Sequence, residues 1–465
     1  MQLHLRRRRL IFKYNALVIP MKSGPIPTQS GSFFIKKRSC HPDEAKTYAE
    51  GVFRKVIATY LTDILYLAIP FGPTRSMSNK SSIFQSLDKL REWTDRDPNR
   101  VALDAAKYPE LPVREIATQL KLRRKAISKF PSWSGKDLLY TERALEQSSG
   151  EIAAQHKHNW LKGRVIDLSG GLGSDLIHSA DQINFMAYCD INADLCDLFR
   201  HNTSVLGIFP DAIHHGDGIE ILKNYPDDFF DIVYVDPDRR MGKGRTVSLK
   251  EASPDISNHL DLILSKGKLL LVKASPALDP TEAERQIPGL SEYHVVSVDA
   301  EVKEVLLLVC REKKDRVIRS ASVIKGDQYI HLTDEGIRST NWKGDVPVIF
   351  CEPDPAIIRA ELCSELAAKH DVFHISPSSV YLVGDEKPEN FPGRVFRVME
   401  VIPANFRSVK DWCKANSYTK ANIARREFPE DPESIRKALK LKDGGDLYLF
   451  FTKHKGNYAC LACVK

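Results

Sequence analysis

The stretch VIDLSGGLGSDL, residues 165–176, runs from an apolar segment into three glycines within four residues. This pattern is typical of a buried strand followed by a tight loop, because glycine lacks the Cβ that would keep other atoms at a distance. The loop departs from G-x-G-x-x-G, since Leu176 stands where a third glycine would follow Gly171 and Gly173. Asp167, which ends the apolar run, would repel a pyrophosphate. The loop therefore favours a positively charged ligand over a dinucleotide, and a nicotinamide-dependent oxidoreductase is the alternative.

Composition predicts a soluble protein of several domains. The chain has 465 residues, 42% hydrophobic and 28% charged, which is enough for about two to four domains. The longest apolar stretch, residues 56–71, contains Asp63 and is short for a membrane span. Nine scattered cysteines fit a reducing compartment. We therefore expect a cytoplasmic protein with no membrane segment.

Charge is distributed unevenly along the chain. Lys and Arg number 13 against 4 Asp and Glu in residues 1–76, 15 against 8 in residues 393–465, and 40 against 49 between them. Basic ends around an acidic middle favour a polyanionic partner at the ends and chemistry in the middle. Solvated surface charge without a partner is the alternative.

The first part of the chain predicts two regions. Residues 1–76 are rich in turn formers without a sustained period, which predicts a poorly ordered or mis-assigned extension, with the functional start at Met77. Helical spacing follows, with Leu90 and Trp93 in one stripe and Ile116 and Leu120 in another. Residues 77–150 are therefore expected to be a helical region.

Acidic residues end two further predicted strands after the glycine loop. Asp190 comes 23 residues after Asp167 and could accept hydrogen bonds from both ribose hydroxyls of a nucleoside. Asp217 could accept from an adenine amino group, with Gly218 leaving room for the ring. Each aspartate alone is more often a helix N-cap. In this order they indicate S-adenosylmethionine, which carries a sulfonium and an amino group but no phosphate.

The next predicted strand, FDIVYV, ends at Asp236 and Pro237, and Arg239 and Arg240 follow in the loop. This loop would lie beside the ligand, so Asp236, Pro237 and Arg239 are candidate catalytic residues, and both arginines could bind substrate phosphate. A turn without a chemical role is the alternative. A fifth strand ends at Lys273, a lesser catalytic candidate, and two more strands complete seven with an antiparallel final pair.

The order DLSGGLGSD, CDIN, GDG, VDPDRR and VKASPALD resembles that of class I S-adenosylmethionine-dependent methyltransferases. With EPDPAIIRAELCSELAAKHDVFHISPSSVYL, FPGRVFRVMEVIP and KLKDGGDLYLF downstream, the chain is similar to bacterial methyltransferases that carry a ferredoxin-like module and a C-terminal THUMP-like domain. The resemblance implies an α/β protein with a Rossmann-like seven-stranded core over residues 151–315. A linker and ferredoxin-like module would follow over 316–392, and a THUMP-like domain over 393–465.

The resemblance also implies a function. S-adenosylmethionine would be the cofactor, held by Asp167, Ser169, Gly171 and Gly173 at the methionine end. RNA, either tRNA or rRNA, would be the substrate by analogy with true THUMP domains. Asp238 departs from the proline usual in amino-group methyltransferases, which speaks against an exocyclic base nitrogen as acceptor. A non-catalytic RNA-binding protein with the same fold is a further alternative.

The C-terminal 73 residues predict alternating strands and short helices. Arg425 and Arg426, with three neighbouring lysines, could form a patch for RNA phosphates, although they could equally serve only solubility. Cys460 and Cys463 lack a second pair of metal ligands, so no metal site is expected and both cysteines are interpreted as structural. The sequence does not indicate the oligomeric state.

Overall fold

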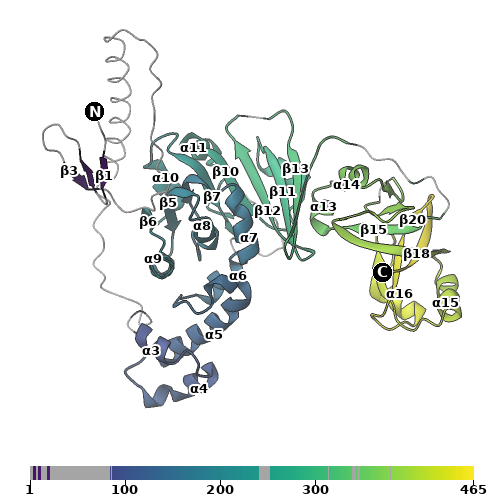
Figure 1. The fold of residues 1–465 in the computed structure, drawn as a ribbon, viewed down its shortest axis with the longest axis horizontal. Helices are drawn as coiled ribbons and strands as arrows, with labels where there is room; N and C mark the ends of the chain where they lie inside the picture. The colour runs from purple at the N-terminus through teal and green to yellow at the C-terminus, as the bar shows by residue number, and fades with distance from the viewer. Residues whose placement is uncertain are drawn as a thin grey trace, which may run out of the picture. The chain divides into compact units, whose positions relative to one another are not determined.

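The computed structural model (Figure 1) describes three short N-terminal strands and residues 84, 86–239, 252–312, 314–337, 342, 346–377 and 379–465. The chain divides into two units, Met1–Asn79 and Lys80–Lys465. In the first unit an antiparallel sheet is formed by β1 (His4–Arg6), β2 (Arg9–Ile11) and β3 (Val18–Pro20). The rest of residues 1–76 and the predicted start at Met77 lie outside the described residues, so the poor order of this extension stays a prediction.

Short helices form the region before the large sheet, as the sequence predicts. Leu90 and Trp93 are fully buried, and so are Ile116 and Leu120 on the next stripe. The helices are α3 (Leu87–Glu92), α4 (Pro98–Leu103), α5 (Val113–Lys129), α6 (Glu142–Gln147) and α7 (Glu151–His156), with 3-10 turns η1 (Asp104–Lys107), η2 (Pro131–Trp133) and η3 (Lys157–Asn159).

A nine-stranded sheet follows, in the order β14-β13-β11-β12-β10-β7-β4-β5-β6. β4 to β7 and β10 run parallel, and β12 lies antiparallel between β10 and β11. The strands are β4 (Gly163–Asp167), β5 (Ile183–Asp190), β6 (Ala212–His215), β7 (Phe230–Val235), β10 (Gly267–Ala274), β11 (Glu292–Val298), β12 (Glu301–Cys310), β13 (Ile318–Lys325) and β14 (Gln328–Thr333). Seven of these strands, β4 to β7 and β10 to β12, confirm the predicted Rossmann-like core and its antiparallel final pair.

The core does not end where the sequence placed its boundary, at residue 315. β13 pairs parallel with β11 over the whole length of β11, from Glu292↔Ile318 to Val298↔Ile324, and β14 pairs with β13. Without β13, β11 would expose a row of unpaired backbone groups at the sheet edge. Residues 318–333, assigned to the linker and ferredoxin-like module, therefore belong to the large sheet.

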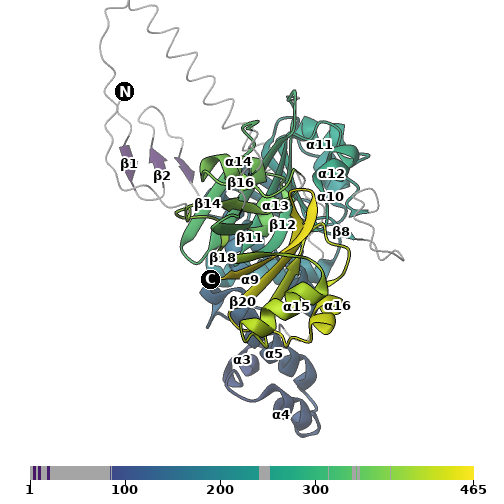
Figure 2. The ribbon, with the colours of Figure 1, turned by 90° about the vertical axis from the view of Figure 1, so that its right-hand side faces the viewer.

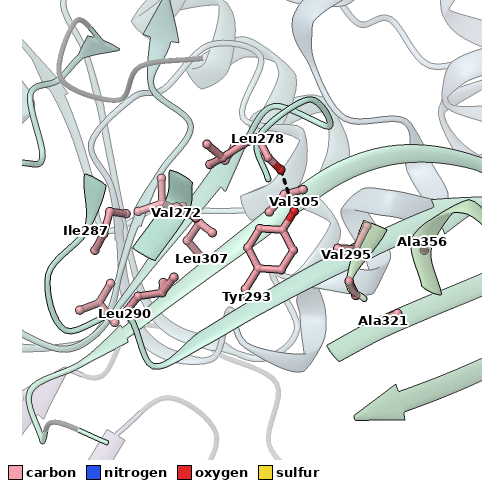
Figure 3. Close-up of a cluster of buried hydrophobic side chains, with 14 of the residues drawn as sticks. Val272, Leu278, Ile287, Leu290, Tyr293, Val295, Val305, Leu307, Ala321 and Ala356 are labelled. Atoms are coloured by element: carbon pink, nitrogen blue, oxygen red, sulfur yellow. Dashed lines mark hydrogen bonds between the residues drawn. The ribbon is translucent and has the colours of Figure 1, made fainter. Parts of the chain in front are cut away.

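Helices cover both faces of the large sheet, because successive side chains of a strand point to opposite sides. Ile166 and Val233 pack toward α10, α11 and α12, whereas Val165 and Ile232 pack toward α8 and α9. Figure 3 shows part of the first core, where the Tyr293 hydroxyl donates to the Leu278 carbonyl at 2.7 Å. These helices are α8 (Ser174–His178), α9 (Ala193–Leu206), α10 (Gly218–Lys223), α11 (Leu260–Lys266) and α12 (Pro280–Gln286).

The strand order creates a crevice at one edge of this sheet. From β4 the chain winds outward through β5 and β6, and it then returns to β7 on the other side of β4. The loops after β4 and β7 therefore leave in opposite directions, and ligands of open α/β sheets bind at such a reversal. A short ribbon of β8 (Asp238–Arg239) and β9 (Ala252–Ser253) follows β7.

A second sheet has the order β16-β17-β15-β18-β21-β20-β19 and crosses the predicted boundary at residue 392. Its strands are β15 (Ile349–Pro353), β16 (Phe373–His374), β17 (Leu382–Gly384), β18 (Gly393–Pro403), β19 (Asn422–Arg425), β20 (Leu447–His454) and β21 (Asn457–Val464). Its helices are α15 (Phe406–Ala415) and α16 (Pro432–Leu439), whereas α13 (Pro355–Arg359) and α14 (Cys363–Lys369) share a core with β11 and β13 of the large sheet. Figure 2 shows α15 and α16 beside the strands at the C-terminal end, and both helices share a core with β20 and β21.

Cys460 and Cys463 both lie in β21 and are buried. Their odd spacing puts them on opposite faces of the strand, in two different hydrophobic cores. The two sulfurs therefore cannot share a ligand, which agrees with their structural interpretation. In the part of the chain that the structure describes, no helix is both long and apolar enough to cross a membrane.

Candidate active site

A cleft of about 1800 Å³ opens at the carboxyl ends of β4, β5 and β7. Its walls come from the loops after these strands, from the end of α5 and from the segment that joins α6 to α7. The structure brings ten of the predicted site residues together here: Asp167, Ser169, Gly171, Gly173, Asp190, Asp217, Gly218, Asp236, Pro237 and Lys273.

Asp167 organises the glycine loop. Its Oδ1 accepts hydrogen bonds from the Ser169 backbone at 2.8 Å, from the Ser169 hydroxyl at 2.7 Å and from the Gly170 backbone at 3.1 Å. Burial raises the pKa of Asp167 to about 7, although these donors act against the rise. Ser169 also accepts a hydrogen bond from the Asp236 backbone at 2.7 Å. The loop after β4 is therefore tied to the loop after β7.

Two of the predicted glycines are needed for packing. A Cβ on Gly173, which has a φ of +69°, would lie 2.3 Å from the Phe199 ring. A Cβ on Gly218 would lie 2.5 Å from the carbonyl of Leu168. Space for an adenine ring is therefore not what requires glycine at 218. Gly171 differs from both, because a Cβ there would meet no atom within 4 Å.

Asp190, the last residue of β5, and Asp217, which follows β6, accept hydrogen bonds from different parts of the backbone. The backbone of Gly171 donates to Asp190 Oδ2 at 2.8 Å, and that of Asn192 donates to Oδ1 at 2.7 Å. Burial raises the pKa of Asp190. Asp217 is the N-cap of α10, because its Oδ1 accepts from the backbone of Ile219 at 2.8 Å. The N-cap alternative for an isolated aspartate therefore applies to Asp217, which nevertheless lines the cleft.

Asp236 forms an ion pair with Lys273. The carboxyl is 37% exposed in the cleft, whereas the lysine side chain is 12% exposed. Burial raises the pKa of Asp236 against the opposing effect of Lys273. Burial alone would lower the pKa of Lys273, but the charges of Asp236, Asp175 and Glu304 outweigh it and raise the pKa. The pair therefore holds a carboxylate in the lining of the cleft.

A buried ionic network lies beneath this pair, and the sequence analysis did not predict it. Lys157, fully buried, contacts Glu304 at 2.6 Å and Asp175 at 3.2 Å. The Tyr234 hydroxyl donates to Asp175 at 2.6 Å. Ser149 receives hydrogen bonds from the amino groups of Lys157 at 3.1 Å and of Lys273 at 3.2 Å. The network thus connects the helical region to the catalytic candidates.

The two carboxyl groups of this network differ in the net direction of their pKa shifts. Burial raises the pKa of Glu304. For Asp175 burial acts in the same direction, but the ammonium groups of Lys157 and Lys273 outweigh it and lower the pKa. A glutamate inside the apolar strand EVKEVLLLVC is a signal that could have revealed part of this network.

The other predicted site residues are four arginines. Arg239 is in β8, and Arg240 lies outside the described residues. Arg425 and Arg426, at the end of β19, are exposed and do not line the cleft. Arg425 donates to the Phe428 carbonyl at 2.7 Å. Among the described residues, no group of three or more His, Cys, Asp or Glu side chains is arranged to hold a metal ion.

Comparisons with known proteins agree with this architecture. Residues 393–465 match a family described as THUMP domain-like. Proteins from two strains of Mycobacterium tuberculosis, both called uncharacterized S-adenosylmethionine-dependent methyltransferases, are 27% identical over 341 residues, 71% of this chain and 90% of each relative. A crystal structure from Porphyromonas gingivalis W83, of a protein provisionally assigned as a methyltransferase, superposes with a TM-score of 0.71 at 24% identity, covering 83% of this chain and 98% of that one.

These similarities confirm the resemblance that the motifs indicated. The chain has a methyltransferase fold with a THUMP-like domain at its C-terminus, and it is related to S-adenosylmethionine-dependent methyltransferases.

Proposed function

We propose that this chain transfers the methyl group of S-adenosylmethionine to RNA, with tRNA and rRNA as the candidate substrates. The observation that carries the proposal is Asp190, a carboxylate at the end of the second parallel strand, held by the Gly171 and Asn192 backbones inside an acidic cleft. The similarity to S-adenosylmethionine-dependent methyltransferases supports the cofactor. The THUMP-like match supports RNA as the substrate, and so does the composition of residues 393–465, with 15 basic against 8 acidic residues.

The residues of the cleft fit S-adenosylmethionine better than a dinucleotide. Each Asp190 oxygen accepts one backbone hydrogen bond and keeps capacity for a ribose hydroxyl. Ile191, which is 74% exposed and lines the cleft, offers an apolar surface for an adenine ring. Asp167 and Asp217 add negative charge, which suits a sulfonium and an ammonium group and repels a pyrophosphate. Open space beside Gly171 leaves room for the methionine end.

S-adenosylmethionine supplies an electrophilic methyl carbon bonded to a positively charged sulfur. The chain contributes alignment of the acceptor, which is worth on the order of 7–11 kcal/mol when both reactants are held. Asp236 accepts a hydrogen bond from the acceptor and takes its proton. Its raised pKa makes it a stronger base than an ordinary carboxylate, and Lys273 holds it in place. Pro237 limits the freedom of the loop.

The arginines are proposed to bind RNA phosphates. Arg239 and Arg240 follow the catalytic loop, and Arg425 and Arg426 are exposed on the THUMP-like domain. Guanidinium groups suit this role because they bind phosphate through two parallel hydrogen bonds. Arg425 keeps only part of this capacity, since one of its nitrogens donates to Phe428.

Calorimetry with S-adenosylmethionine and with NAD tests the cofactor. Replacing Asp190 by Ala leaves two ribose hydroxyls without acceptors, which costs roughly 1–3 kcal/mol and weakens S-adenosylmethionine binding by about 10-fold or more. Asp194→Ala, which removes an exposed carboxylate nearby on α9, is the control and should bind as the parent does. Unchanged affinity in D190A, or binding of NAD alone, would overturn the assignment.

Methyl transfer itself is tested with labelled S-adenosylmethionine. Total RNA from a strain that lacks the gene is the acceptor, and nucleoside mass spectrometry identifies the product. Asp236→Ala should lower the single-turnover rate and leave S-adenosylmethionine and RNA binding unchanged. If the cofactor binds but RNA gains no label, the acceptor is not RNA or the protein only binds it.

A further inference from the structure

The exposed face of α5 carries basic residues that lead toward the cleft. At 100° per residue, Arg114, Lys121 and Lys125 lie within about 20° of one line along the helix. All three are exposed, whereas Ile116 and Leu120 on the opposite side are buried. The row is about 22 Å long from Arg114 to Lys129, at 1.5 Å per residue. It is therefore a straight basic surface on a helix anchored by its apolar side.

We propose that this row, the α5 track (Arg114, Lys121, Lys125 and Lys129), binds the phosphates of the single-stranded RNA next to the base that enters the cleft. The inference rests on the proposed methyltransferase function and adds to it the surface that guides the substrate. It places a substrate contact on the helical region, in addition to the one proposed on the THUMP-like domain.

The cations of α5 divide into two groups by their partners. Arg123 donates to the Leu138 carbonyl at 2.9 Å, and Arg124 donates to the Arg96 carbonyl at 2.7 Å, so both stabilise the fold. In the described part of the chain, Arg114 and Lys121 have no side-chain hydrogen bond or ion pair. Two cations of the α5 track are therefore available to a ligand.

The two other track residues have partners within the protein. Lys125 contacts Glu146 at 2.6 Å, in a pair where both side chains are about half exposed. Such a pair is weak and open to solvent, so Lys125 can also reach a phosphate. Lys129 donates to the carbonyls of Leu145 at 2.6 Å and Glu146 at 3.0 Å. The free cations thus lie at the far end of the track and the engaged ones near the cleft.

Charge around the cleft explains why phosphates need this surface. The cleft is lined by more acidic than basic side chains, even though Lys273 and Lys157 pair with three of the acidic ones, and this excess would repel a sugar–phosphate backbone. The only acidic residue of α5, Glu115, lies about 100° around the helix from Arg114. Phosphates are therefore favoured along α5 and disfavoured in the cleft.

The α5 track also ends where a base would have to enter. Ser128 and Lys129, at its C-terminal end, line the cleft. Ile152, 42% exposed, lines the same wall and offers an apolar surface to a base. A base inside a duplex cannot reach such a cleft, so the target must be unstacked and its flanking strand held outside. Phosphate contacts on α5 and a base in the cleft satisfy both requirements.

The test compares two double charge reversals of equal net charge. Arg114→Glu with Lys121→Glu removes the free end of the α5 track. Lys162→Glu with Lys369→Glu is the matched control, because both lysines are exposed and lie outside the track. Lys162 immediately precedes β4 and therefore lies at the sheet edge opposite the cleft. The probe is a fluorescein-labelled single-stranded oligouridylate, and anisotropy gives its affinity across a salt series.

The track variant should lose two phosphate contacts. Its slope of log affinity against log salt should be shallower by about 1.4, and its affinity at 0.1 M salt lower by about 25-fold, at 0.7 per contact for single strands. The control should keep the parent's slope. Arg114→Lys with Lys121→Arg preserves charge and should bind as the parent does, and coinciding thermal melts would show that the reversals leave the fold intact.

Equal slopes in the track and control variants would overturn the inference, as would a parent that does not bind the oligouridylate at low salt. Calorimetry with S-adenosylmethionine on the same samples separates this inference from the proposed function. Intact cofactor binding with equal slopes refutes the α5 track alone. Loss of RNA binding in the track variant, in a protein that does not bind S-adenosylmethionine, supports the track and refutes the methyltransferase.

Discussion

Asp167 combines a structural and an electrostatic role at one residue. Its Oδ1 accepts three hydrogen bonds from the glycine loop, which a neutral carboxyl or an amide oxygen can also do. Its burial makes ionisation costly and raises its pKa to about 7. Near neutral pH Asp167 is therefore present partly as the neutral carboxyl, which favours the folded state, and partly as the carboxylate, which attracts a cation.

The stability of the protein should depend on pH through Asp167. Between an unfolded-state pKa of about 3.9 and the folded-state value of about 7, the folded state holds the extra proton. The free energy of unfolding should therefore fall as pH rises through this window, by up to about 1.4 kcal/mol per pH unit from this site. Asp167→Asn keeps the acceptor oxygen and cannot ionise, so this part of the slope should vanish. Urea denaturation at several pH values measures it, and parallel profiles for parent and variant would contradict the prediction.

Lys157 is the cation in direct contact with two buried carboxylates, so its loss should be severe. Lys157→Met leaves Glu304 and Asp175 in the interior without their contacting ammonium group and should cost about 3–5 kcal/mol. Lys125→Met removes a surface lysine at the same 2.6 Å distance from its glutamate and should cost less than about 1 kcal/mol. Chemical denaturation compares the two. Similar losses would show that Lys157 and its partners do not act as a buried network.

Gly171 and Gly173, in the loop between β4 and α8, are required for different physical reasons. Gly171→Ala and Gly173→Ala both place a side chain at positive φ, which costs about 1–2 kcal/mol. Only the second also drives a Cβ into Phe199. We therefore expect G173A to lower the melting temperature more than G171A. G171A, whose Cβ would enter open space in the cleft, should instead weaken S-adenosylmethionine binding. Thermal melts measure the loss of stability, and calorimetry measures cofactor binding. A lower melting temperature for G171A than for G173A would contradict this prediction.

The sequence revealed those parts of the site that lie within single segments. Asp167, Asp190 and Asp236 each end an apolar run, and parallel strands bring such ends to one edge of the sheet. The Lys157–Glu304 pair joins residues 147 positions apart, and no local pattern carries that distance. The two extra strands were missed for a related reason. Whether β13 joins the large sheet depends on the free edge of β11, which composition does not show.

At the scale of the whole molecule, the division at Asn79 and Lys80 predicts what can be removed. A chain that begins at Met77 retains every residue of the cleft and of both hydrophobic cores of the large sheet. We expect it to melt at the same temperature as the full chain and to bind S-adenosylmethionine equally well. Differential scanning calorimetry tests this, and a decrease of several degrees would show that the removed residues pack against the rest.

The other end of the chain should not be separable at the boundary that the sequence placed at residue 392. β15 pairs with β18 from Ile349↔Arg397 to Pro353↔Gly393, so one sheet is built from both sides of that boundary. The Phe350 ring stacks on Phe450, with centroids 4.3 Å apart, and shares a core with Val383 and Leu461. Ending the chain after residue 392 would leave the β15 edge unpaired and this core open.

We therefore expect a chain that ends at residue 392 to melt at a lower temperature than the parent and to aggregate. Its cleft should still bind S-adenosylmethionine below that temperature, because the residues that line it all fall between 128 and 304. Phe350→Ala in the full chain removes the same contact without exposing a strand edge, and it should cost about 3–5 kcal/mol. Light scattering and thermal melts measure the first effect and chemical denaturation the second. If the shortened chain melts as the parent does, β15 to β17 do not depend on the THUMP-like domain, and the shared sheet contributes little to stability.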